Sequence, residues 1–127
     1  MEADIYTALA EAVRSAGGAD SIGVVSEPGE TAVSYAGTEI LRQYMDGTVH
    51  MAAVFGISGM DTDQRQRELI ERLCAVGERI AAGNITVEGL DNIRCRVVSP
   101  PTATVHNEHL WIYMTQVRAT FMYRKKG

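Results

Sequence analysis

Histidine, serine and aspartate are the side chains whose types and spacing could support chemistry in this chain. His106 and His109 are three residues apart in a polar stretch, but no third metal ligand follows at a recognisable spacing. The residues around Ser58 do not form a nucleophile elbow, and no base can be assigned to it. We therefore interpret both histidines as surface residues, and acyl transfer has no support.

The remaining candidates have structural explanations. Asp61 and Asp63 stand where a helix is expected to begin, so capping explains them better than metal binding. Cys74 and Cys95 have no metal-ligand spacing, and we interpret them as small, reduced core residues. The 12 glycines are spread out as turn residues and do not form a phosphate-binding loop. The sequence gives no reason to expect an enzyme, a cofactor or a metal.

Length and composition are typical of one folded domain. The chain has 127 residues, of which 46% are hydrophobic and 22% are charged. No apolar run approaches the roughly 20 residues that cross a bilayer. The N-terminus is acidic where a signal peptide would be basic. We expect a protein that is made in a cytoplasm and does not enter a membrane.

The net charge of −4 is distributed unevenly along the chain. Residues 1–63 hold ten acids and two arginines, whereas residues 64–127 hold six acids and ten bases. Such polarity can simply follow from which faces are solvated. It also suits a head-to-tail assembly, because a heterologous interface joins two different surfaces. Both interpretations are open at this point.

A β-hairpin over residues 40–59 is the strongest local signal among the elements that must position these residues. Its second half has the period-two pattern of a half-buried strand, with one apolar face made of Val49, Met51, Ala53, Phe55 and Ile57. Asp46 and Gly47 supply the positive φ that a tight turn between the strands needs.

Two helices are expected on either side of this hairpin. The first has apolar residues at helical spacing between Ile5 and Ala16 and ends at Gly17. The second runs from Asp61 to about Ala82, and Asp61 with Gln64 resembles a capping box at its start. Its apolar face consists of Leu69, Ile70, Leu73, Val76, Ile80 and Ala81.

Shorter strands are expected before the hairpin and after the second helix. Residues 21–26 and 31–35 are candidate strands, with Gly37 as a break, although this part could equally be a long loop. Residues 93–98 read as a strand ended by Ser99, Pro100 and Pro101. Residues 102–109 are polar and irregular. A long strand with one apolar, aromatic face then covers residues 111–123.

This order of elements predicts a single domain over residues 1–127. We expect an α+β fold, with a mostly antiparallel sheet and two helices packed on one face. The helix stripe and the strand faces must cover one another, because they have no other partner. The predicted shared core is Phe55, Ile57, Leu69, Leu73, Ile80, Val117 and Phe121.

Several segments resemble the small tail terminator proteins of long-tailed bacteriophages, including minor capsid proteins of phages of Gram-positive bacteria. The resemblance lies in residues 44–47 (YMDG), 54–59 (VFGISG), 61–67 (DTDQRQR) and 116–123 (QVRATFMY). In that family a hairpin with a similar turn leads through a similar strand end into a helix, and a terminal strand closes the sheet. The match covers most of residues 1–126 in element order.

The resemblance implies a structural virion protein without catalysis. Tail terminators form a ring, usually a hexamer, on the head-proximal end of the tail tube. The implied partners are other copies of the chain, the tail tube protein and a head-completion or connector protein. Genomic DNA would pass the lumen without sequence-specific binding. The implied location is the virion tail, after assembly in the host cytoplasm.

Charged residues are the candidates for contacts in such a ring. Arg118, Arg124, Lys125 and Lys126 are expected near an acidic surface of the adjacent subunit. A channel for DNA would favour an acidic lining, because tight phosphate binding would impede passage. The candidate lumen or interface acids are Glu27, Glu30, Glu39 and Asp46.

Two other classes of function are alternatives. One is a different virion connector or a tail tube subunit of similar build, which would form open tubes where a terminator forms closed rings. The other is a small intracellular ligand-binding module or enzyme, which would need a deep pocket with perturbed titratable groups.

Overall fold

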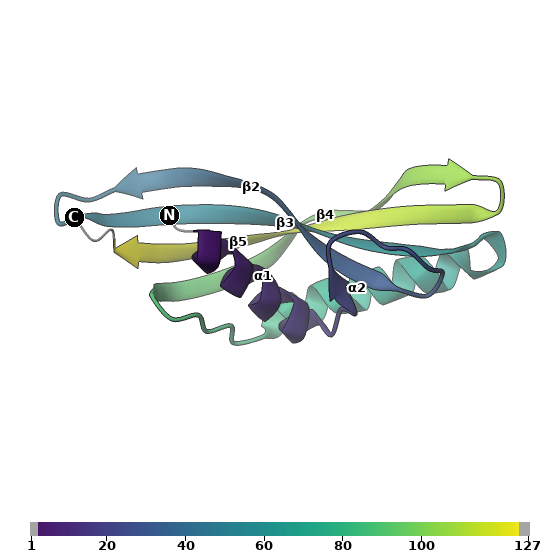
Figure 1. Ribbon diagram of the computed structural model, residues 1–127, viewed down its shortest axis with the longest axis horizontal. Helices are drawn as coiled ribbons and strands as arrows, with labels where there is room; N and C mark the ends of the chain where they lie inside the picture. The colour runs from purple at the N-terminus through teal and green to yellow at the C-terminus, as the bar shows by residue number, and fades with distance from the viewer. Residues whose placement is uncertain (1–2, 125–127) are drawn as a thin grey trace.

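The computed structural model describes residues 3–124 as one mostly antiparallel sheet with two helices (Figure 1). The elements are α1 (Ala3–Gly17), β1 (Ser21–Ile22), β2 (Thr31–Gln43), β3 (Thr48–Thr62), the 3-10 turn η1 (Asp63–Arg65), α2 (Gln66–Ala82), β4 (Leu90–Asn107) and β5 (Leu110–Arg124). The strand order is β1-β2-β3-β5-β4, and only the β1–β2 pair is parallel. The predicted α+β class with a mostly antiparallel sheet is confirmed.

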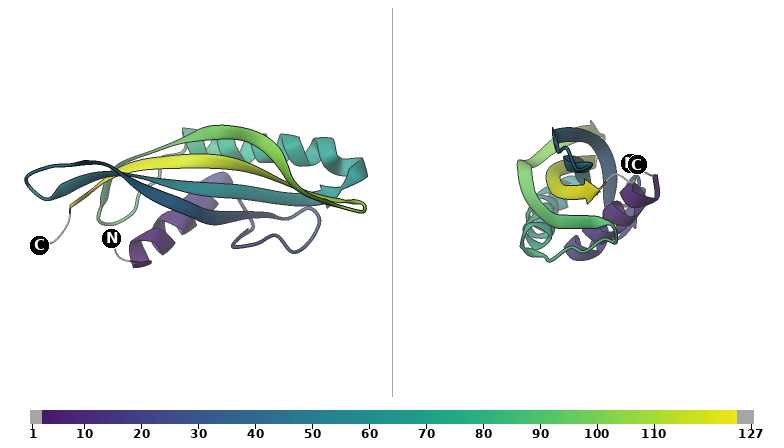
Figure 2. Two further views of the ribbon diagram at one scale, coloured as in Figure 1. Left: turned by 90° about the horizontal axis from the view of Figure 1, so that it is seen from above. Right: turned by 90° about the vertical axis from the view of Figure 1, so that its left-hand side faces the viewer.

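The molecule is elongated, because the β2–β3 and β4–β5 hairpins point in opposite directions along one long sheet (Figure 1). The two further views show that the sheet is strongly twisted and that both helices lie on the same side of it (Figure 2). Strands twist in a right-handed sense as they lengthen, so hairpins of this length necessarily rotate along the sheet. Among the described residues, no helix has the length and apolar character to cross a bilayer.

The sheet therefore has a helix face and an open face. Residues paired across neighbouring strands share a face, so the register assigns every side chain to one of them. Phe55 of β3 and its partner Val117 of β5 lie on the helix face. The open face is the opposite surface of the sheet, and in β3 and β5 it consists of His50, Ala52, Val54, Gly56, Ser58, Met60, Ile112, Met114, Gln116, Arg118, Thr120 and Met122.

The core fills the space between the helix face and the two helices. All seven predicted core residues have no exposed surface and belong to one hydrophobic cluster, so this prediction is confirmed. Close packing also explains a glycine in β3. A Cβ atom at Gly59 would lie 2.6 Å from Cδ1 of Leu69, so a larger residue there would force the buried Leu69 side chain to shift.

The β2–β3 turn has the conformation that its glycine indicated. Gly47 has a φ of 90°, while Asp46 is not among the residues with positive φ, so the prediction holds for Gly47 alone. The Gly47 N–H donates to the Tyr44 carbonyl at 3.1 Å, and the Tyr44 N–H donates to the Thr48 carbonyl at 2.9 Å. This is a short loop in which glycine takes the left-handed position.

The prediction that α2 begins at Asp61 is wrong. Strand β3 continues to Thr62, and α2 begins at Gln66 with no side-chain cap at Arg65. Asp61 is a buried strand residue that pairs with Trp111 of β5. Pairing with the long last strand overrides the local capping signal, because each added pair completes backbone hydrogen bonds that a helix start would leave open.

Strand β4 is also much longer than predicted. It passes through Pro100 and Pro101 and includes residues 102–107, which the sequence indicated as irregular. The prolines fit because β4 is an edge strand, where a missing N–H need not break a ladder. Its register with β5 is irregular between Ser99 and Thr102, which is where the prolines lie.

Two predictions near the N-terminus are corrected, as is one about a cysteine. Strand β2 runs through Gly37 to Gln43, because a bulge at Ala36 absorbs the irregularity. Only Ser21 and Ile22 of the segment 21–26 form a strand. Cys74 is exposed on α2 and is not a core residue.

Candidate functional site

The tip of the β4–β5 hairpin gathers an aspartate, two histidines and a tryptophan. Asp63 accepts a hydrogen bond from Nε1 of Trp111, and its Oδ2 lies 3.4 Å from Nδ1 of His109. His106 stacks on the Trp111 ring at 3.7 Å between centroids, with its Nε2 3.7 Å from Asp63 Oδ1. The hydrogen bond from Trp111 is the main cause that lowers the pKa of Asp63, and both histidines act in the same direction.

This cluster ties the hairpin tip to the start of α2. The Asp63 N–H donates to the His109 carbonyl at 2.9 Å, so backbone and side chain hold the same junction. Both histidines are exposed, as the sequence indicated, and they also contact Asp63. No group of three or more metal-ligating side chains that could hold an ion occurs within residues 3–124.

Burial raises the pKa of the Cys95 thiol to about 11, which keeps it protonated at neutral pH.

The open face of the sheet carries a second group, which we call the arginine cluster: Arg94 and Arg96 of β4 and Arg118 of β5. Arg96 and Arg118 are directly paired across the two strands, and Arg94 is paired with Thr120. Nη2 of Arg118 lies 3.7 Å from Oε2 of Glu39 on β2. The three guanidinium groups are thereby brought to one surface of a protein whose net charge is −4.

The structure places the predicted interface bases at different positions. Arg118 lies on the open face, where it forms an ion pair with Glu39 of β2. Arg124 is exposed at the end of β5, close enough to Asp46 in the β2–β3 turn to help lower the pKa of that carboxyl, although the main cause is a hydrogen bond from the Thr48 backbone. Lys125 and Lys126 lie outside the described residues.

The predicted lumen acids do not form one surface. Glu27 and Glu30 lie in the loop between β1 and β2, where the Met60 N–H donates to the Glu30 carbonyl at 3.4 Å. Asp46 lies at the other end of β3, beside Thr48. Met60 and Thr48 are twelve positions apart along β3, which corresponds to roughly 40 Å. Glu39 lies between these two positions, on the open face.

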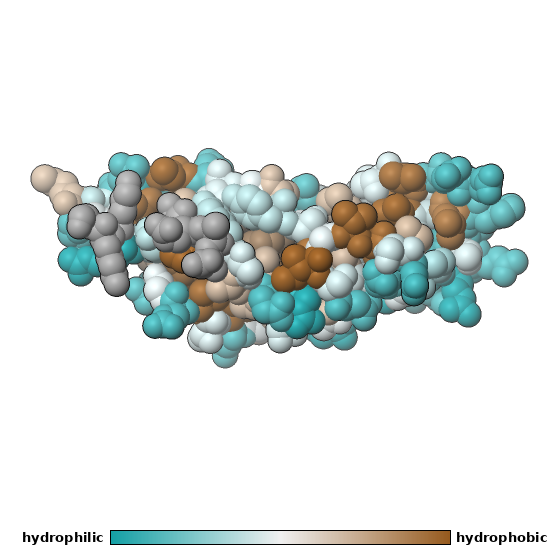
Figure 3. Space-filling view, viewed as in Figure 1, coloured by the Kyte–Doolittle hydropathy of each residue, from teal (hydrophilic) through white to brown (hydrophobic). Residues whose placement is uncertain are grey.

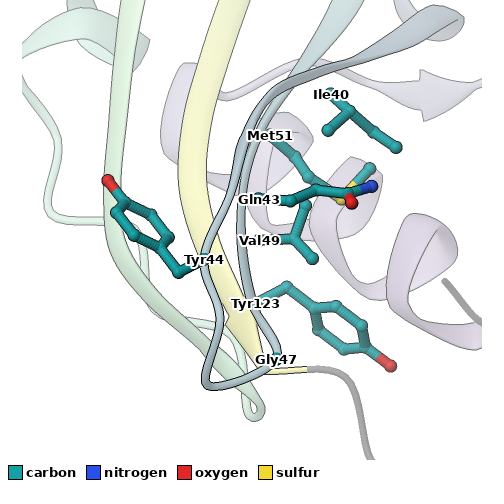
Figure 4. A pocket seen from close by; sticks show the side chains of 7 residues that line it. All are labelled: Ile40, Gln43, Tyr44, Gly47, Val49, Met51 and Tyr123. Atoms are coloured by element: carbon teal, nitrogen blue, oxygen red, sulfur yellow. The ribbon is translucent and has the colours of Figure 1, made fainter.

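A shallow hollow of about 180 Å³ lies beside the β2–β3 turn, on the helix face. Ile40, Val49, Met51 and Tyr123 extend to one side of the hairpin there, whereas the ring of Tyr44 turns to the other side (Figure 4). The volume is below the range of about 300 to 1,000 Å³ that small-molecule sites occupy. Nothing in this lining provides a titratable group for catalysis other than the tyrosine hydroxyls.

The two outer strands present unpaired edges with exposed hydrophobic residues. Strand β1 pairs only with Ala32 and Val33, so the outer edge of β2 is open over residues 34–43. The large hydrophobic side chains exposed on β2 are Tyr35, Ile40 and Leu41, and those on β4 are Val97, Val98 and Val105. On the face seen in Figure 3, hydrophobic residues form a broken row towards the end that carries the β4–β5 hairpin.

Sequence reasoning missed two members of the arginine cluster. Arg94 and Arg96 alternate with the apolar residues of the predicted strand 93–98, so the period-two pattern already placed them on one face. What the pattern lacked was the register with β5, which puts Arg118 directly opposite Arg96. The Trp111 contact with Asp63 was missed for the same reason, because 48 residues separate the two.

A comparison with known protein families finds no match for this chain, and none is found among curated protein sequences.

Proposed function

We propose that the protein is a structural subunit of a bacteriophage virion, a tail terminator that caps the head-proximal end of the tail tube as a ring. The observation that carries this proposal is the presence of two different unpaired edges, β2 and β4, on opposite sides of one sheet. A ring of identical subunits needs two unlike surfaces that fit each other, because every interface in it is heterologous. We propose that the two edges are this pair of surfaces.

The β2 edge has the features of a strand that pairs with another chain. Lysine, proline, a β-bulge or a short strand length normally limits association through an open edge. The open part of β2 has bulges at Ala36 and Leu41 but contains neither lysine nor proline, and Ile40 is 54% exposed there. On β4, Val97 and Val98 are about 40% exposed. Pro100 and Pro101 follow shortly after them and cannot donate backbone hydrogen bonds, so any pairing is confined to the residues before Pro100.

Contacts through these edges would join the sheets of neighbouring subunits around the ring. Apolar contacts would provide most of the interface energy, because individual exposed ion pairs contribute only about 0 to 1 kcal/mol. The count of six subunits, the tail tube protein and the connector as partners, and the virion location rest on the resemblance described above. The chemistry of the edges supports association of the chain with itself.

Electron microscopy and analytical ultracentrifugation of the purified full chain test this proposal. We expect a closed ring of one size, and we expect the double variant Ile40→Lys and Leu41→Lys to sediment as a smaller species. Val24→Lys is a control for the addition of a lysine elsewhere, because Val24 is 85% exposed outside the sheet edge. A chain that stays monomeric at all concentrations, even with tail tubes present, contradicts the proposal.

The same experiment separates the alternatives. Open tubes in place of closed rings would indicate a tail tube subunit. A monomer that binds a small molecule would indicate a ligand-binding module or an enzyme.

A further inference from the structure

The arginine cluster places like charges directly opposite one another. Arg96 and Arg118 form a cross-strand pair, in which Cβ atoms are about 5 Å apart, and like charges at such positions destabilise a sheet. Arg94 follows on the same face two residues along β4, a distance of about 7 Å. The sheet therefore concentrates three positive charges where its own stability would favour a mixture of signs.

The chain compensates little of this charge. Glu39 is the single acid that forms an ion pair with the cluster within residues 3–124, at 3.7 Å from Arg118, and its side chain is 70% exposed. Arg94 and Arg96 are exposed and take part in no ion pair within the same residues. An arginine held in this way keeps its donors available for an external anion.

The cluster also lines a continuous depression on the open face. One hollow, of about 420 Å³, is bordered by the three arginines with Cys95 and Thr120. A second hollow, of about 380 Å³, shares Arg94 and Thr120 with the first and adds His50, Asn92 and Met122. Two further side chains that can donate hydrogen bonds, His50 of β3 and Asn92 of β4, therefore lie beyond the arginines.

We propose that this depression binds the phosphate backbone of nucleic acid without sequence preference. Guanidinium groups bind phosphate through paired, charge-assisted hydrogen bonds, and hydroxyl and amide groups complete such contacts. An acidic protein partner would need apolar anchors at the centre of its interface. The depression offers Met122 as its one large apolar side chain, so its composition favours a polyanion.

The proposed ring is needed for only one part of this inference, which is where the depression would lie in the assembly. If neighbouring sheets join at their β2 and β4 edges, the helices cover one side of the joined sheet and the open face forms the other. The open face would then line the channel through which DNA passes. Three arginines per subunit would hold the passing DNA weakly, since such contacts weaken steeply with salt. This differs from the expectation that acids line the lumen.

Fluorescence anisotropy with a labelled DNA duplex tests the proposal, using the full chain at salt concentrations between about 50 and about 200 mM. We expect binding by the native chain that falls with salt. The double variant Arg94→Gln and Arg96→Gln should reduce the slope of log affinity against log salt by about 2 per bound subunit. Arg65→Gln with Arg67→Gln is the matched control, because it removes the same charge from exposed positions at the start of α2.

Sedimentation of the same samples separates this inference from the proposed function. Loss of DNA binding in the Arg94 and Arg96 variant, with the assembly and the control unchanged, supports the inference. An assembled native chain that does not bind the duplex at low salt overturns it and leaves the ring proposal standing. A variant that dissociates the assembly while DNA binding is unchanged also overturns it, because the face would then be a protein interface. If the native chain binds DNA as a monomer, the ring proposal is contradicted and the proposed binding surface is supported.

Discussion

Asp61 of β3 and Arg72 of α2 form an ion pair, with 3.5 Å between Oδ2 and Nη1, at the junction of the sheet and the helix. The Asp61 side chain is only 4% exposed, and its Oδ1 accepts a hydrogen bond from the Thr62 N–H at 2.9 Å. Asp61, which the sequence suggested as a helix cap, thus anchors α2 to strand β3. Charges of this kind are costly to separate, because burial removes the water that would otherwise solvate them.

Arg72→Met should therefore lower the free energy of unfolding. We expect a loss of about 3 kcal/mol. This is the lower end of the range of about 3 to 5 kcal/mol for breaking a buried ion pair, because Arg72 is 30% exposed. Urea denaturation of both proteins measures the difference. Arg67→Met is the control, since Arg67 is 92% exposed and its loss should change stability by less than about 0.5 kcal/mol. Equal losses in the two variants would contradict the structural importance of the ion pair.

Leu73→Ala tests the packing of α2 on the sheet. Leu73 has no exposed surface and belongs to the main hydrophobic cluster, so truncation leaves a cavity that costs about 2 to 5 kcal/mol. Thermal and urea unfolding provide the measurement. Cys74→Ala is a neighbouring control, because Cys74 is exposed on the same helix. An unchanged melting temperature for Leu73→Ala would remove the proposed helix-on-sheet core.

Substitutions at Gly47 should follow the cost of a positive φ. A non-glycine residue in the left-handed region costs about 1 to 2 kcal/mol, and a β-branched residue is strained further. We expect the loss of stability to increase from Gly47→Asn through Gly47→Ala to Gly47→Val, because asparagine tolerates a φ near the observed 90° best. Thermal unfolding of the three variants measures the order. An equal effect of all three would mean that the turn does not depend on this φ.

The lowered pKa of Asp63 predicts a loss of stability in acid. Its folded pKa lies below the ordinary value of 3.8, so the ionised carboxylate stabilises the fold. This contribution is fully present above pH 3.8 and is lost as the pH falls through the folded pKa. The stability difference between the native chain and Asp63→Asn should shrink over that range. Glu108→Gln, on the same hairpin tip, is the control, and a difference that is independent of pH would contradict the assignment.

Salt should weaken the proposed assembly without abolishing it. Exposed ion pairs are screened at a Debye length of about 8 Å in physiological salt, whereas apolar contacts are not. Reversing the charge of Arg124, Lys125 and Lys126 to glutamate should weaken assembly further if these bases face acids of the adjacent subunit. Analytical ultracentrifugation across salt concentrations measures both effects. An assembly indifferent to salt and to charge reversal would eliminate this electrostatic contribution.

The fold class, the two helices and the core followed from the sequence, because they depend on local periodicity. Residues such as Phe55, Leu73 and Phe121 recur at the spacing of one strand face or one helix stripe, and an apolar face must be covered wherever it occurs. Gly47 was predictable for a similar reason, since a tight hairpin turn needs a residue that accepts a positive φ.

Tertiary pairing decided where the strands end and which polar residues meet. The long partner strand β5 extends β3 past Asp61 and β4 past Pro101, against local signals for a helix start and a strand end. Register brings Arg118 opposite Arg96 and Trp111 beside Asp63, although these pairs are far apart in the chain. Contacts of this kind arise from the alignment of two whole strands, and a change of one residue in that alignment would turn every side chain to the other face.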